Sequence, residues 1–320
     1  MSVYSPSGSG DVHVDQVLTQ ISIGWPNNGL VGERLFPAVT VQKQSDKYYT
    51  FGREGWLPED DIRAPGGVAR EVTGAALSTD TYFCVEHALS IAVTDEERKN
   101  ADSPLSPDRD GTEIITSKLM LGRERVIQTM VTTAANYAST NTVTLSGTSQ
   151  WNDYANSDPI GNLRTGKRAV HSRIFLEPNT LLIPYTTMSI LEDHPDFLER
   201  IKYSERAIFS PELLAAILGF GSVIVPGAGI NTAPLGQAES LAYLWGNDVV
   251  MAYVPSRPGL KIPAFGYEFV LEGQVVDRWR ENPRKSDIIR VSRCYDHKFT
   301  GVDSSDDVIS GYLILDATNV

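Results

Sequence analysis

The chain has 320 residues, 41% of them hydrophobic and 9% aromatic, which is enough for one large domain or two to three smaller ones. A net charge of −12 argues against tight nucleic-acid binding through a basic face. The two cysteines, Cys84 and Cys294, form no disulfide framework. The start of the chain does not resemble a signal peptide, and the longest apolar run, residues 213–220, is too short to span a bilayer. We therefore expect a soluble protein that is made in the cytoplasm.

Residues 1–45 are polar and rich in turn residues, which predicts an extended arm rather than a domain. Residues 46–82 begin with the strand-like run KYYTF and return as a second strand after a long polar excursion. That middle part has charges of both signs and few core-forming residues, so it cannot bury itself. The pattern predicts a long hairpin that projects from the body of the protein.

The stretch from Asp108 to Ala138 has the period of one long helix, with Asp110 and Glu113 as a capping pair. Its apolar stripe is predicted at Ile115, Leu119, Val126, Met130, Ala134 and Tyr137, and its charges, including Arg123 and Glu124, are predicted off that stripe. An alternating strand over 81–93 precedes the helix, and Thr94 and Glu97 form a capping box that opens a short helix between the two. A helix of this length suggests a central element against which sheets pack, although an ordinary α+β enzyme can also contain such a helix.

Residues 155–262 alternate short helices and strands, which predicts a compact α/β lobe. Asp158 starts one helix there and Ser210 another, while 241–245 and 249–254 are expected to pair around the turn Gly246-Asn247-Asp248. From Phe265 onward the chain is mostly strand. We expect these last strands, including Tyr312–Leu315, to join the strands before the long helix in one sheet beside it.

Motifs of catalysis are weak in this sequence. It has no phosphate-binding loop and no nucleophile elbow, and none of its five histidines lies at a zinc-like spacing from another ligand. The carboxylates Asp95, Glu96 and Glu97 stand where a helix start favours negative charge. We therefore predict no catalytic residue, no metal and no cofactor.

Two charged segments favour contacts between copies of the chain over binding of nucleic acid. A basic cluster surrounds Trp279, and the projecting hairpin carries the acidic run 59–61. Surface ion pairs contribute only about 0–1 kcal/mol each, but many copies of the same pair in a symmetric assembly would fix how neighbouring chains align. A solvated turn is the alternative for the basic cluster. The candidate contact residues are Trp56, Glu59, Asp60, Asp61, Arg63, Arg70, Arg278, Arg280, Arg284 and Lys285.

Several blocks of sequence, in order, resemble the major capsid proteins of tailed bacteriophages. They are HPDFLERIKYS from His194, SPELLAAILGFGSVIV from Ser210, YLWGNDVVMAYVP from Tyr243, FGYEF from Phe265 and VDRWRENPRKSDIIRV from residue 276. The resemblance implies an α+β protein with the Hong Kong 97-like fold. Its parts would be an N-arm at 1–45, an E-loop at 46–82, a P-domain at 83–154 with the spine helix 108–138, an A-domain at 155–262 and return strands of the P-domain at 263–320.

The same resemblance implies a shell protein that self-assembles into pentamers and hexamers around double-stranded DNA without reading its sequence. Portal, separate scaffolding and decoration proteins are candidate partners, no membrane is involved, and the location is the virion after assembly in the bacterial cytoplasm. Some family members crosslink through an E-loop lysine, but residues 48–98 contain no lysine, so we expect no crosslinks. The segment before the E-loop is short, so we expect any scaffold to be a separate protein.

Two alternatives remain at this point. An encapsulin-type shell would hold enzymes instead of DNA, and a cytosolic α/β enzyme would be a monomer or small oligomer with a polar pocket. Particle contents would separate the first from a phage head, and one micrograph of the purified protein would separate the second from both shells.

Overall fold

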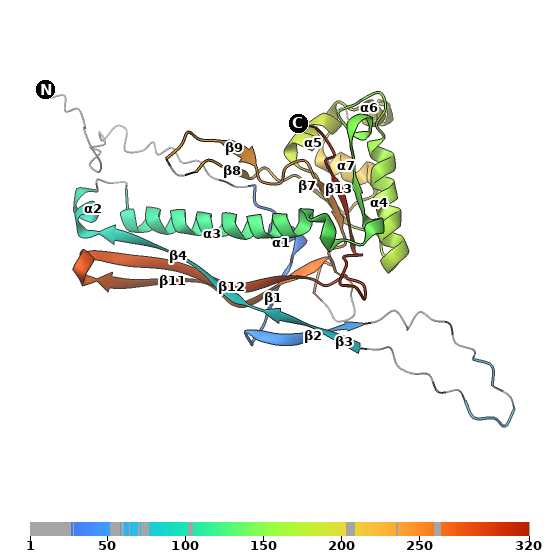
Figure 1. Cartoon of the computed structure of the whole chain (residues 1–320), viewed down its shortest axis with the longest axis horizontal. Helices are drawn as coiled ribbons and strands as arrows, with labels where there is room; N and C mark the ends of the chain where they lie inside the picture. The colour runs from blue at the N-terminus through green and yellow to red at the C-terminus, as the bar shows by residue number, and fades with distance from the viewer. Residues whose placement is uncertain are drawn as a thin grey trace.

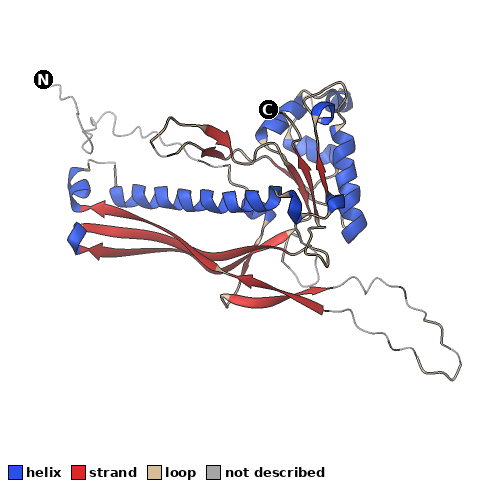
Figure 2. Cartoon of the chain, in the orientation of Figure 1, coloured by secondary structure: helices blue, strands red, loops and turns tan. Residues whose placement is uncertain are grey.

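A computed structural model describes residues 27, 29–51, 58, 61–63, 65–69, 71, 77–101, 105–202, 209–234, 236–258 and 264–319. The molecule is elongated (Figure 1). A long helix lies along a long sheet, a lobe of short helices and strands sits at one end, and a two-stranded hairpin extends beyond the sheet at that same end (Figures 1 and 2). None of the helices that the structure describes combines the length and apolar character that a membrane span needs.

The long sheet has four strands in the order β1-β11-β12-β4. Its bounds are β1 Ala38–Thr40, β4 Val85–Thr94, β11 Gly266–Glu281 and β12 Ser286–Phe299. β4, from before the long helix, pairs antiparallel with β12 over ten residues, and β12 pairs with β11. The predicted sheet between the strands around residue 90 and the late strands is therefore confirmed. The short helix α2, Asp95–Asn100, follows β4 with the predicted Thr94–Glu97 capping box.

The long helix α3 runs from Pro107 to Thr132, 26 residues and therefore about 39 Å. It is shorter than the predicted 108–138 and begins with Pro107 after Ser106, so the predicted Asp110–Glu113 capping pair is wrong. Beyond Thr132, Asn136 Nδ2 and the Tyr137 hydroxyl donate to the free carbonyls of Met130 and Val131. These side chains end the helix by satisfying backbone acceptors that another turn would use.

The buried face of α3 differs from the predicted stripe. Ile115, Ile127 and Val131 are buried, whereas Val126 is 51% exposed. Arg123 and Glu124, predicted off the stripe, are both buried. The first half of α3 packs Ile115 and Leu119 against β4 and β12, and the second half passes under the lobe.

The lobe has a five-stranded sheet in the order β5-β13-β10-β6-β7. Its strands are β5 Thr142–Thr144, β6 Thr180–Leu182, β7 Ser222–Ile224, β10 Val249–Ala252 and β13 Gly311–Leu315. Its helices are α4 Pro159–Ile174, α5 Tyr185–Glu192, α6 Pro195–Ile201 and α7 Pro211–Leu218. Ser210 caps α7 as predicted, and Asp158, predicted as the first residue of a helix, is the cap of α4. The predicted pairing of Tyr312–Leu315 beside the long helix is wrong, because β13 pairs with β10 and β5.

Both faces of the lobe sheet are buried, which explains why β10 reads as a continuous apolar run. Val249 and Met251 face the helices of the lobe, while Val250 and Ala252 face the end of α3. A pairing of 241–245 with 249–254 is also wrong. β9, Leu241–Tyr243, pairs with β8, Gly229–Asn231, in a separate hairpin that Figure 1 shows above α3.

Part of the predicted N-terminal arm belongs to the core. Helix α1, Gly32–Leu35, is one turn long, and Leu35 and Phe36 are fully buried against the lobe and the end of α3. The projecting hairpin consists of β2, Ser45–Phe51, and β3, Leu77–Phe83. It is anchored where it leaves the sheet, since Tyr82 stacks on Phe269 at 4.7 Å and Cys84 N–H donates to the Gln44 carbonyl.

Candidate inter-subunit surfaces

The turn between β11 and β12 carries an ion-pair network with α2 and the start of α3. Three arginines and three aspartates take part: Arg98, Arg278, Arg280, Asp95, Asp108 and Asp287. Arg98 donates to Asp108 and also contacts Asp287, while Arg280 makes a bidentate contact with Asp95. Arg278 donates to Asp287, and these hydrogen bonds, followed by those from Arg280, lower the Asp287 pKa to about 2. We call these six residues the tip network.

The tip network changes how the predicted basic cluster is interpreted. Its positive and negative charges balance, so Arg278 and Arg280 already have acidic partners within the chain. Arg284 and Lys285, on the exposed turn itself, contribute the charge that is left, and Arg284 only approaches Glu281 at 3.6 Å. Lys285 has a left-handed backbone (φ 45°), which closes the turn.

The acidic half of the prediction lies on the projecting hairpin. Asp61 and Arg63 are exposed and belong to no helix or strand. Trp56, Glu59, Asp60 and Arg70 lie outside the described residues. At the base of the hairpin, Tyr48 donates to Asp80 at 2.5 Å, and burial raises the Tyr48 pKa further than this contact does.

A buried polar centre joins α3 to the long sheet. Arg123 donates to both oxygens of Glu268, at 2.8 and 2.6 Å, and Arg293 donates to one of them at 3.0 Å. Glu268 is fully buried and Arg123 is 7% exposed. Burial opposes the charge on Arg123, but Glu268 and Glu33 outweigh it and raise the Arg123 pKa. We call Arg123, Glu268 and Arg293 the buried triad.

Two more groups complete this centre. Burial, and then the charges of Arg123 and Arg293, lower the pKa of His297 to about 3, so its ring is neutral at neutral pH. Glu124 accepts hydrogen bonds from the backbone N–H groups of Val31 and Gly32 and from the Trp245 indole. One carboxylate on α3 therefore holds both the N-terminal segment and the lobe.

A serine, a histidine and an aspartate meet in the lobe without forming a catalytic triad. Ser157 Oγ lies 3.1 Å from His194 Nε2, and His194 Nδ1 accepts from the Asp196 backbone N–H. Because Nδ1 accepts, Nε2 carries the proton and donates to Ser157, whose hydroxyl donates to a carbonyl. A serine nucleophile needs the opposite tautomer. His194 therefore caps α6.

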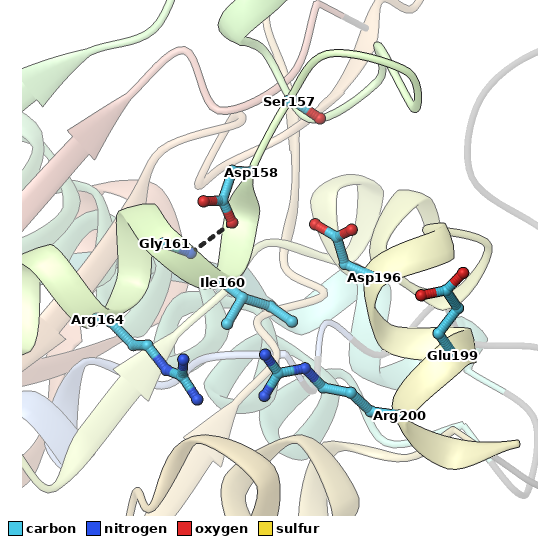
Figure 3. Close-up of a pocket in the computed structure, with 8 residues that line it drawn as sticks. All are labelled: Ser157, Asp158, Ile160, Gly161, Arg164, Asp196, Glu199 and Arg200. Atoms are coloured by element: carbon cyan, nitrogen blue, oxygen red, sulfur yellow. Dashed lines mark hydrogen bonds between the residues drawn. The ribbon is translucent and has the colours of Figure 1, made fainter. Parts of the chain in front are cut away.

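Figure 3 shows the surface hollow beside these residues, about 580 Å³ in volume. The guanidinium groups of Arg164 and Arg200 point toward one another across it, and carboxylates of Asp158, Asp196 and Glu199 line its rim. The Asp158 carboxylate is occupied as the cap of α4, accepting from Gly161 N–H at 2.7 Å. A wide hollow with charges of both signs suits contact with another protein surface better than enclosure of an apolar ligand.

Comparison with known proteins places this architecture in context. No protein-family model matches the chain. The sequence is 28% identical over 306 residues to a major capsid protein of Burkholderia phage BcepMu, across 94% of this chain and 95% of that protein. A solved phage-related protein from Bordetella bronchiseptica RB50 is 26% identical with a TM-score of 0.70, over 97% of this chain and 98% of that one. The chain is a homologue of phage major capsid proteins.

The fold of this capsid-protein homologue extends to distant shells. The capsid structure of cyanophage P-SCSP1u has a TM-score of 0.61 at 10% identity, over 98% of this chain and 99% of that one. The phage capsid fold expected from the sequence blocks is confirmed.

Sequence reasoning missed the buried centre of this capsid-protein homologue. Hydropathy treats Arg123 and Glu124 as surface residues. The available signal was position, since Arg123 lies four residues after Leu119 and four before Ile127, on the face that packs.

Proposed function

We propose that this chain is the structural subunit of the head shell of a tailed double-stranded DNA phage. The observation that carries the proposal is the match to a phage major capsid protein over nearly the whole of both chains. An elongated body with a projecting hairpin at one end and a charged turn at the other also suits a subunit that contacts several neighbours. The role is structural, and the subunits assemble into pentamers and hexamers of an icosahedral shell in the virion.

The parts of the chain divide between assembly roles under this proposal. Residues 1–45 act as the N-arm, 46–82 as the E-loop, 83–154 with α3 as the first part of the P-domain, and 155–262 as the A-domain. Residues 263–310 return to the P-domain. We assign 311–319 to the A-domain, because β13 pairs with β10 in the lobe sheet, and we assign β5 (Thr142–Thr144) to it as well, because β5 pairs with β13 in that sheet.

Contacts between subunits would combine the exposed charges of the turn and the hairpin. Arg284 and Lys285 are exposed at the turn, and Asp61 is exposed on the hairpin. Arg278 and Arg280 would shape the turn through the tip network rather than bind a neighbour. Trp56, Glu59, Asp60, Arg63 and Arg70 remain candidates on the hairpin side.

The contents and other partners follow from the same proposal. A chain with net charge −12 would enclose DNA without gripping it. Portal, scaffolding and decoration proteins are the partners a phage head would add, and assembly would take place in the host cytoplasm. The encapsulin alternative has less support, because the curated relative is a phage major capsid protein.

The decisive experiment is negative-stain microscopy of the purified protein, followed by analysis of particle contents after phage infection. Closed shells of uniform size that protect DNA support the proposal. A monomer or small oligomer under all conditions would favour the enzyme alternative. Shells filled with protein cargo would favour the encapsulin alternative.

A charge-reversal pair tests the contact residues within the same assay. Arg284→Glu with Lys285→Glu should reduce the yield of shells, and Asp61→Lys on the same chain should restore part of it. Arg109→Glu, on an exposed i,i+4 pair of α3 (78% exposed side chain), is the matched control. Equal shell yields for the double variant, the triple variant and the control would show that Arg284, Lys285 and Asp61 make no contact between subunits.

A denaturing gel tests the absence of crosslinks. Residues 48–98 contain no lysine, so boiled particles should run at 35.1 kDa without a ladder.

A further inference from the structure

The hollow beside α4 and α6 holds two arginines that have no acidic partner. The guanidinium groups of Arg164 and Arg200 point toward one another across it, and within the described part of the chain neither makes an ion pair. Asp196 precedes Arg200 by four residues, a spacing that favours an ion pair within a helix, yet it lies beside His194 instead, at 3.7 Å. Two guanidinium groups that face one another are stabilised by an anion that both can bind.

The rim of the hollow limits the kind of anion. Its three carboxylates, those of Asp158, Asp196 and Glu199, outnumber the two arginines, so a polyanion such as nucleic acid would be repelled. A single carboxylate, by contrast, can accept hydrogen bonds from both guanidinium groups at once. The chemistry therefore favours an acidic side chain of a protein over a nucleic-acid backbone.

The β8–β9 hairpin offers one such carboxylate near its turn. Glu239 is the one charged residue between 228 and 244, it is exposed, and the described part of the chain supplies no cation to it. The turn beside it is ordered, because Asn231 Oδ1 accepts from the backbone N–H groups of Ala233 and Ser240 at 3.0 and 3.1 Å. A carboxylate on an ordered turn binds with a smaller loss of conformational entropy.

The same hairpin exposes large apolar side chains. Leu241 and Tyr243 are 76% and 46% exposed, and the Tyr243 ring lies 6.0 Å from that of Tyr185, itself 56% exposed. A two-stranded hairpin is marginally stable by itself, and a group of exposed apolar side chains marks a surface that another protein covers. The β8–β9 hairpin therefore has the composition of an interface.

The β8–β9 hairpin and the hollow lie on opposite faces of the lobe sheet. Ile230 and Leu244 of the hairpin pack in the cluster that holds Val250 and the end of α3. Leu163 of α4 and Phe197 of α6 pack in the cluster on the other face. Figure 1 shows the hairpin above α3, with α4 and α6 on the far side of the lobe. The hairpin thus cannot reach the hollow of its own chain, and a contact between the two would repeat head to tail from copy to copy.

We propose that the β8–β9 hairpin of one copy inserts into the hollow of the next, with the Glu239 carboxylate between Arg164 and Arg200. The carboxylate accepts from both guanidinium groups, and the contact covers Leu241. This inference rests on the proposed function, because a head-to-tail contact of this kind closes in a ring of subunits. It adds a contact between lobes to those of the charged turn and the projecting hairpin.

The test is chemical crosslinking of assembled particles whose chains carry both Glu239→Cys and Arg200→Cys. The probe is a short bis-maleimide, because the proposed ion pair holds the two backbones two side chains apart. Cys84 and Cys294 are buried and do not compete. A denaturing gel should show a ladder at multiples of 35.1 kDa, whereas either variant alone and the unassembled double variant should stay at that mass.

The outcomes separate this inference from the proposed function. Shells of normal shape without a ladder would overturn the inference and leave the proposed function intact, whereas a wild-type chain that forms no shell would overturn both. Crosslinked dimers from Glu239→Cys alone would also overturn the inference, because they would show that the hairpin meets its own copy instead of the hollow.

A charge exchange tests the pairing itself. Glu239→Arg brings three cations together and should reduce the yield of shells at least about tenfold. Adding Arg200→Glu should restore most of the yield, because one carboxylate again lies between two guanidinium groups. Two exposed residues outside the hollow are matched controls: Glu192→Arg at the end of α5, and Arg168→Glu on α4, one turn after Arg164. Full yield in Glu239→Arg, or no recovery in the double variant, would contradict the pairing.

Discussion

The buried triad makes a quantitative prediction for Arg123→Met. The substitution keeps much of the side-chain volume but removes the two shorter of the three arginine hydrogen bonds to Glu268. Glu268 is fully buried, so its carboxylate keeps only Arg293. Removing one partner of a buried ion pair costs about 3–5 kcal/mol, and the remaining arginine argues for the lower end, about 3 kcal/mol.

The assay is equilibrium unfolding in urea of the unassembled chain, followed by circular dichroism, with the free-energy change taken from the shift in midpoint. Arg290→Met is the matched control. Arg290 also donates twice to an aspartate, Asp277, but both side chains are about 40% exposed, so we expect a cost of about 1 kcal/mol or less. Equal costs for the two variants would refute the claim that burial sets the strength of the triad.

A double-mutant cycle separates the pair from general damage to the core. Glu268→Gln and the double variant with Arg123→Met complete the cycle. Residues in one hydrogen-bonded network couple by about 0.5–3 kcal/mol, so the double variant should lose less than the sum of the single losses. Simple additivity would mean that Arg123 acts through packing alone.

Two further predictions concern pH and packing. The folded pKa of His297, about 3, lies below its unfolded value of about 6.5, so the unfolded state takes up a proton first and stability falls as pH drops between these values. His297→Gln should reduce that slope near pH 5 by up to about 1.4 kcal/mol per pH unit, and an unchanged slope in urea titrations would contradict this. In Gly166→Ala the added methyl group would overlap Met251, so the folded protein should lose about 1–3 kcal/mol of stability. Gly122 is exposed on α3 with open space around it, so Gly122→Ala should stabilise the folded protein by about 0.5–1 kcal/mol. Both changes are measured as shifts of the urea midpoint.

Features set by a few neighbouring residues were predictable from the sequence. The Thr94–Glu97 capping box and the cap Ser210 form as predicted, and the helix predicted from Asp158 begins there, because a helix start needs only a capping side chain and the next turn of backbone. The sequence blocks from His194 onward led to the fold through resemblance, and the comparisons confirm that fold.

Features set by distant residues were not predictable in this way. The turn Gly246-Asn247-Asp248 predicts a hairpin, but the strands on its two sides belong to different sheets, since β9 pairs with β8 and β10 with β13. Nothing local distinguishes the two outcomes. The burial of Arg123 depends on Glu268, 145 residues away, so hydropathy of the helix alone cannot show it. The contact residues predicted on the projecting hairpin remain predictions, because a contact between chains is visible only when both chains are present.

The position of β13 has a consequence for the order of events during synthesis. Residues 311–315 lie between β5 and β10 in the lobe sheet, although the other four strands of that sheet all precede them in the chain. During synthesis those four strands therefore leave the ribosome before β13 does. The lobe sheet cannot close until β13 has emerged, which delays any surface that the lobe presents and gives earlier nascent chains no complete partner to join.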